Sequence, residues 1–226
     1  MSLSVTLNDL RTATLVAANM ENSTFIATTP VGSSELDRYI NQSWFELYEL
    51  LLGKGQDLFL SSYSLTLVNG QDTYALPADF YKLRGVDITS GGDTRDVTPF
   101  SFAARNDFKN ARGWTQFGPV QYRLYGANIV FIPVPGSSDQ AKLWYYPAPT
   151  AFTSGAQSQD FVAGWDEYVI VDAAIKCLRK EESDVSVLLA QKAALKTRIE
   201  ENIAVRDAGH PSRVTIVRGG RRAFGY

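Results

Sequence analysis

The side chains of this chain that could do chemistry are few and scattered. Its one histidine is His210 and its one cysteine is Cys177. A catalytic triad or a metal centre needs several such groups held together by a folded scaffold, whereas His210 stands before Pro211 in the C-terminal tail. Cys177 lies among apolar residues of an expected helix, as a core side chain does. We therefore expect neither residue to be catalytic, and we expect no metal site.

Two further motifs resemble reactive sites. Gly53-Lys54-Gly55 lacks the upstream glycine and the following Ser or Thr of a phosphate-binding loop, so it indicates the end of a helix. Asp166, Glu167 and Asp172 cluster near the start of another expected helix, and a glycosidase needs only two well-placed carboxylates. Acids in a first turn are, however, what the helix dipole favours. The sequence thus predicts no enzyme activity and no cofactor.

Aromatic residues are concentrated in one part of the chain. Such side chains can stack on sugars or bases, although alternating aromatics more often fill a small β core. A carbohydrate-binding or hydrolase module that uses this aromatic face is the alternative from a different functional class. The residues concerned are Trp114, Phe117, Tyr122, Tyr125, Trp144, Tyr145 and Tyr146.

The C-terminal residues 207–226, here called the arm, carry the strongest functional signal. After Asp207 the arm has arginines and no acid, and Val214-Thr215-Ile216-Val217 has the composition of a strand that lacks a partner edge. Arginine can also grip carboxylates with two hydrogen bonds. We expect the arm to be flexible in the free protein and to dock on a partner. The predicted docking residues are Arg213, Val214, Ile216, Val217, Arg218, Arg221, Arg222, Phe224 and Tyr226.

Composition limits the class of protein. The chain has 226 residues, 45% hydrophobic and 20% charged, which is typical of one core with room for an inserted subdomain. Its net charge of -2 argues against a general nucleic-acid-binding domain. A single cysteine excludes an internal disulfide. Because no signal peptide or membrane-spanning pattern is visible, we expect folding in the cytoplasm.

Apolar periodicity and capping signals predict four helices. The first begins at Thr6, with Asp9 as capping partner, and the second begins at Ser34, with Asp37 in the same role. The third carries an apolar stripe over residues 165–178 that is wide enough for burial on two sides.

A charged turn at 180–184 joins the third helix to the fourth, which Ser183 or Asp184 would cap. These two helices form an αα-hairpin. A polar linker at 155–159 is expected to precede them.

Between residues 58 and 149 the sequence pattern changes to that of strands, with a period of 2. Asn69-Gly70 and Gly126-Ala127-Asn128 each predict a hairpin turn. Residues 99–111 are too polar for a central strand and indicate a short helix or a long loop. The expected strands cover residues 65–67, 73–76, 83–88, 121–125, 129–132 and 142–146.

These elements together predict an α+β fold. It consists of a four-helix frame (two helical hairpins) with an inserted antiparallel β-module and an extended C-terminal arm. Residues 1–57 hold the N-terminal helices, 58–160 the β-module, 161–206 the C-terminal helical hairpin and 207–226 the arm.

This order of elements, together with three sequence stretches, resembles the head-to-tail adaptor proteins of tailed bacteriophages. The first stretch is Val68-Asn69-Gly70-Gln71-Asp72-Thr73-Tyr74-Ala75-Leu76-Pro77-Ala78-Asp79-Phe80. The second is Lys180-Glu181-Glu182-Ser183-Asp184, and the third is the pair Pro133 and Pro135. The resemblance covers nearly the whole chain.

The resemblance implies a structural neck protein of the virion, assembled in the bacterial host cytoplasm without a membrane partner. Twelve copies would form a homo-oligomeric ring that joins the portal protein of the capsid to a downstream tail or nozzle protein. Packaged DNA would pass through its channel without sequence-specific binding. The helices would form the ring, the β-modules would face the tail and the arms would dock on the portal. Another ring component, such as a tail terminator, is the nearest structural alternative.

Overall fold

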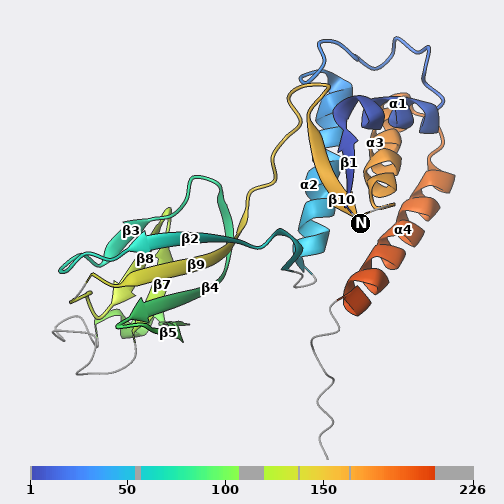
Figure 1. Cartoon of the computed structure of the whole chain (residues 1–226). Coiled ribbons are helices and arrows are strands. Elements are labelled where there is room, and N and C mark those ends of the chain that lie inside the picture. The colour runs from blue at the N-terminus through green and yellow to red at the C-terminus, as the bar shows by residue number, and fades with distance from the viewer. Residues whose placement is uncertain (1, 54–56, 107–119, 137, 163, 207–226) are drawn as a thin grey trace, which may run out of the picture. The chain divides into compact units, whose positions relative to one another are not determined.

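The structure, a computed structural model, describes residues 2–53, 57–106, 120–136, 138–162 and 164–206. Its contacts divide the chain into two compact units. One joins Met1–Gln56 to Ala151–Tyr226, and the other is Asp57–Thr150. Helices dominate the described part of the first unit and strands dominate the second (Figure 1), so the chain is α+β overall.

The first unit contains four α-helices in its described part. Helix α3 packs against each of the other three and buries Val169, Ala173 and Cys177. The capping box predicted at Thr6 and Asp9 is present, and Ser34 Oγ accepts from the amide of Asp37 (3.3 Å). The helices are α1 (Leu7–Ala17), α2 (Glu35–Gly53), α3 (Asp166–Lys180) and α4 (Ser186–Arg206).

A two-stranded antiparallel sheet completes the first unit, and the sequence did not predict it. Strand β1 (Ser2–Thr6) pairs along its whole length with β10 (Ser158–Val162). The expected polar linker at 155–159 is therefore wrong in its second half, because strand pairing begins at Ser158. The first unit resumes at Ala151.

The second unit consists of two four-stranded sheets (Figure 1). In one the strand order is β2-β9-β4-β5, and in the other it is β3-β8-β7-β6. A single apolar cluster that includes Leu67, Ile129, Phe131 and Leu143 draws on both sheets. The first sheet comprises β2 (Ser61–Thr66), β4 (Phe80–Ser90), β5 (Asp93–Asp96) and β9 (Gln140–Pro147). The second comprises β3 (Thr73–Ala75), β6 (Thr98–Pro99), β7 (Gln121–Tyr125) and β8 (Asn128–Ile132).

One of the two predicted hairpins is confirmed. Strands β7 and β8 pair antiparallel across Gly126-Ala127, as expected. The hairpin at Asn69-Gly70 is wrong, because β2 pairs with β9 while β3 pairs with β8. The loop is held instead by Tyr74, whose hydroxyl accepts from the amide of Val68 (2.8 Å) and donates to the carbonyl of Gln71 (2.9 Å).

The structure also tests two further predictions about the second unit. The sheets are not wholly antiparallel, since β6 and β7 pair in parallel. A short 3-10 helix at Phe102–Asn106 lies within the segment expected to be a short helix or loop.

Candidate assembly site

The predicted docking residues of the arm lie outside the described residues. What the structure describes is the helix from which the arm continues and the rest of the first unit. The predicted docking residues outside the described part are Arg213, Val214, Ile216, Val217, Arg218, Arg221, Arg222, Phe224 and Tyr226.

Helix α4 leads into the arm and is attached to its unit by one narrow stripe. Leu195, Ile199 and Ile203, spaced four residues apart, are each no more than 5% exposed. In the first turn of the helix, by contrast, Val187 is 76% exposed and Leu189 is 41% exposed. The start of α4 therefore depends on polar contacts for its position.

Those polar contacts converge on Asp172 of α3, a buried carboxylate. Lys176 donates to it at 2.6 Å and Lys192 of α4 donates at 2.7 Å. Lys192 also reaches Glu46 of α2 at 3.1 Å. Two carboxylates and two ammonium groups thus join three helices without leaving a net charge.

The electrostatics of this cluster favour the ionised forms of Asp172 and Lys192. Burial raises the pKa of Asp172, but hydrogen bonds from Lys176 and Lys192 outweigh it and hold that pKa well below its usual range. Burial likewise lowers the pKa of Lys192, and the hydrogen bonds to Asp172 and Glu46 outweigh it and raise that pKa. The contribution of Asp172 to stability is present above its unfolded-state pKa and is lost as pH falls through the lowered value. The contribution of Lys192 is present below its unfolded-state pKa and is lost as pH rises through the raised value.

Replacing Lys192 by Met tests this cluster. We expect the variant to lose about 1–2 kcal/mol of unfolding free energy, because Asp172 stays buried with one of its two cationic partners. The difference from the natural protein should be constant from about pH 5 to pH 9 and should shrink below about pH 4. Denaturant unfolding across that range measures it. The exposed Lys196→Met variant on the same helix is the control, and an equal loss there would contradict the role of the cluster.

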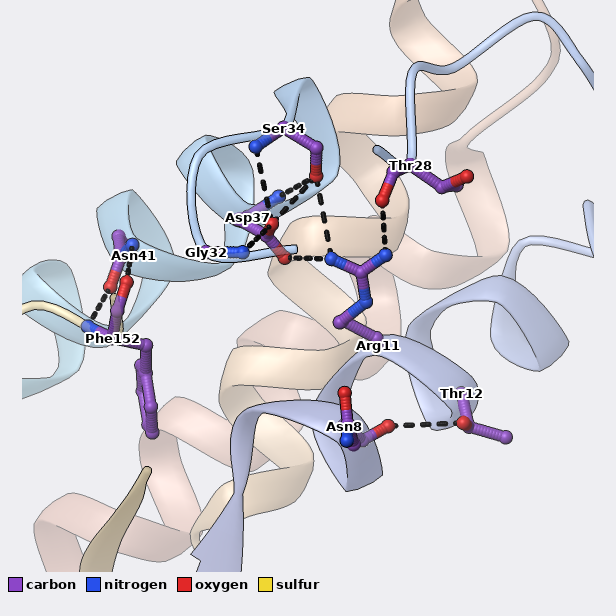
Figure 2. A network of polar contacts seen from close by, with 9 residues as sticks. All are labelled: Asn8, Arg11, Thr12, Thr28, Gly32, Ser34, Asp37, Asn41 and Phe152. Carbon is purple, nitrogen blue, oxygen red and sulfur yellow. Dashed lines mark hydrogen bonds and ion pairs between the residues drawn. The ribbon is translucent and has the colours of Figure 1, made fainter. Parts of the chain in front are cut away.

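A second buried network fixes the segment between α1 and α2 (Figure 2). Arg11 of α1 bonds to Asp37 of α2 at 2.6 Å and also donates to the carbonyl of Thr28. The other carboxylate oxygen of Asp37 accepts from the amide of Gly32 at 2.7 Å and from the hydroxyl of Ser34 at 2.7 Å. One carboxylate therefore holds the segment and both helices together.

The chain also returns to the first unit through fixed contacts. The side-chain amide of Asn41 donates to the carbonyl of Phe152 (3.1 Å) and accepts from its amide (2.7 Å), and the side chain of Phe152 is fully buried. Gly32 has a φ of +95°, and a Cβ there would overlap the carbonyl of Thr153. Only glycine fits this close approach.

Replacing Asp37 by Asn is expected to destabilise the first unit strongly. The change leaves the guanidinium of Arg11 largely buried without its counter-charge, which costs about 3–5 kcal/mol in comparable buried pairs. Thermal and denaturant unfolding measure the loss. Asp160→Asn, which changes an exposed carboxylate of the same unit, should cost less than about 0.5 kcal/mol. A loss of unfolding free energy in Asp160→Asn as large as that in Asp37→Asn would show that the Asp37 network contributes no more to stability than an exposed carboxylate does.

Three of the residues considered for catalysis, Cys177, Glu167 and Asp172, are buried or held by ion pairs. Cys177 is fully buried, and burial raises the pKa of its thiol to about 11, which is the opposite of activation. Glu167 pairs with Arg198 at 3.2 Å, and Asp172 is held in the lysine cluster. His210 lies outside the described residues. Among the described residues there is no group of three or more His, Cys, Asp or Glu that could hold a metal ion.

Of the aromatic residues predicted for a binding face, three are half-buried, namely Tyr122, Tyr125 and Trp144, and two are buried. Tyr145 and Tyr146 are 5% and 2% exposed. Trp144 is half-buried and donates to Asp87 at 2.6 Å, with Lys142 over its ring at 4.1 Å. Trp114 and Phe117 lie outside the described residues.

Comparison with known proteins identifies the family. The described helices include none that is long and apolar enough to cross a membrane. A search of curated proteins gave no match. The sequence profile of the SU10 adaptor protein family, in contrast, matches residues 5–217, which include both units and part of the arm. The chain therefore belongs to the SU10 adaptor protein family, a family of bacteriophage head-to-tail adaptors.

Proposed function

We propose that this chain is a structural neck protein that forms an adaptor ring between the portal of the capsid and the tail. The observation that carries the proposal is the family match over residues 5–217. Twelve copies make the ring, and its channel conducts the packaged DNA without reading its sequence. The protein is assembled in the host cytoplasm and resides in the virion.

Each part of the chain has a role in this proposal. The four helices of the first unit form the frame of the ring, and residues 57–150 face the downstream tail or nozzle protein. The arm docks on the portal, with Val214–Val217 adding a strand to a portal sheet and the four arginines pairing with portal acids. Repetition of this contact around the ring adds avidity.

The lysine cluster and the Asp37 network support the docking role. An adaptor transmits force between two large assemblies, so the helix that leads into the arm must be firmly joined to its unit. Lys192 of α4 pairs with Asp172 of α3 and with Glu46 of α2, and Asp37 joins α1 to α2.

Mixing the purified chain with purified portal particles tests the proposal. We expect electron microscopy to show a ring of copies on one end of each portal, and native mass to give the copy number. A chain that stays monomeric and leaves the portal bare would refute the adaptor role. Binding to a glycan array by that monomer would favour the carbohydrate-binding alternative.

A further inference from the structure

The sheet edges of the second unit differ in how they are protected. The outer strand of a sheet has unpaired N–H and C=O groups that can bind a strand of another molecule. Proteins prevent this pairing with charged residues, with proline or with a short strand. Strand β5 is fully exposed, and three of its four residues are charged. Strand β3 has 3 residues, and β6 has 2 and ends in Pro99. These three edges are therefore protected against pairing with another strand.

Strand β2, at the fourth edge, has 6 residues and contains neither charge nor proline. The amide of Leu67 donates to the carbonyl of Asp139 (2.9 Å), and this pair continues the β2–β9 register. Because bonded and non-bonded positions alternate in an antiparallel ladder, Tyr63 and Leu65 bond to β9. The backbone groups of the intervening residues point away from β9 and form what we call the open edge: Ser62, Ser64 and Thr66.

The side chains of β2 define what kind of strand would fit beside it. Those of the open-edge residues are small hydroxyls on the exposed face of the sheet. Tyr63, which is 38% exposed, and Leu65 lie on the opposite face, where Leu65 packs against the apolar cluster. An added strand therefore needs apolar residues at alternate positions to cover Tyr63 and Leu65.

The arm has this alternation. Val214 and Ile216 stand at alternate positions, as Tyr63 and Leu65 do. Arginines flank the run at 213 and 218. The run of residues 213–218 is as long as β2, which has 6 residues. The run and the edge therefore match in length and alternation.

We propose that the open edge of β2 accepts residues 213–218 from the arm of a second copy, as an added strand, when that arm is not docked on a portal. The pairing deepens the proposed docking function, because it names a second acceptor for the same arm. In copies that are not bound to a portal, this pairing covers the apolar residues of the arm and the open edge of β2. Portal acids then compete for the arm and release it.

Residue-resolved hydrogen exchange on the full-length chain tests the proposal. At high protein concentration we expect the amides of the open-edge residues to exchange roughly tenfold more slowly than in a full-length Val214→Asp/Ile216→Asp variant. The amides of Thr94 and Asp96 on β5 serve as the internal control and should exchange alike in both proteins. Dilution should abolish the protection, because the arm comes from another copy. Equal exchange in the two proteins, or protection that survives dilution, would overturn the proposal.

Substitution at the open edge gives an independent test. Ser64→Pro removes an outward donor without touching the bonds to β9, so it should abolish self-association, measured by sedimentation. The matched control is Thr94→Pro on β5, whose amide also points outward and which should associate normally. If Ser64→Pro fails to fold, Ser64→Lys keeps the donor and repels the arginines of the arm. Normal association of a folded edge variant would refute the pairing. Portal attachment of these variants should be unchanged, so the pairing and the docking can fail separately.

Discussion

A chain that ends at Arg206 is expected to fold normally and to lose stable attachment to portal particles. The physical reason is that a β-branched run flanked by arginines needs an external edge for its backbone groups. Each desolvated arginine pair contributes on the order of 1–3 kcal/mol, and one arm on each copy multiplies the effect. The thermal midpoint should fall by less than about 2 °C, because Ile203 and the residues before it keep the packing of α4.

Co-sedimentation with portal particles and calorimetry measure the two halves of this prediction. The full-length Arg221→Ala/Arg222→Ala variant is the graded control, and it should weaken attachment while leaving the arm in place. A truncated chain that docks as well as the natural one would remove the arm from the portal interface. A truncated chain that unfolds much more readily would make the arm part of its own subunit.

Replacement of residues 57–150 by a Gly/Ser linker is expected to preserve portal binding and to abolish tail attachment. The strands of this segment form their own sheets and apolar cluster, so the first unit keeps its helices and the β1–β10 pair without them. The replaced segment must end before Gln157. The carbonyl of Gln157 accepts from the amide of Leu7 (3.0 Å), and its side chain accepts from the amide of Thr153 (2.8 Å), both within the first unit.

Complementation of a phage that lacks the natural protein measures both outcomes. Heads that carry the shortened protein but no tail are the expected product. The double Ser64→Lys/Tyr63→Lys variant, which keeps the β-module, is the comparison for surface disruption alone. If the shortened protein folds but fails to bind portal, the segment belongs to the portal interface and the division of roles is wrong.

Local signals in the sequence predicted the helices well. The Thr6 and Asp9 box and the Ser34 and Asp37 box both depend on residues three apart, which are visible in any sequence. The partner of Asp37 is different, because Arg11 lies 26 positions away. The same limit applies to Asp172 and Lys192, which are 20 positions apart. A list of charged residues contains no information about which of them meet across helices.

The strands were harder to predict because their partners are distant. Residues 2–6 and 158–162 each alternate weakly, and neither has a turn signal to show that they pair. Asn69-Gly70 is a strong local turn signal, but longer-range pairing of β2 with β9 and of β3 with β8 prevailed. The arm remains a prediction, since its residues lie outside the described part of the chain.

The pairing of β1 with β10 determines when the first unit can be completed during synthesis. Residues 2–6 are synthesised before residues 57–150, whereas their partners at 158–162 are synthesised after them. The second unit, being continuous in sequence, can fold during synthesis, as domains generally do. The N-terminal strand must then wait, unpaired, until residues 158–162 emerge. Slow translation beyond residue 150 is therefore expected to expose nascent chains to chaperones and proteases at β1 and not in the finished second unit.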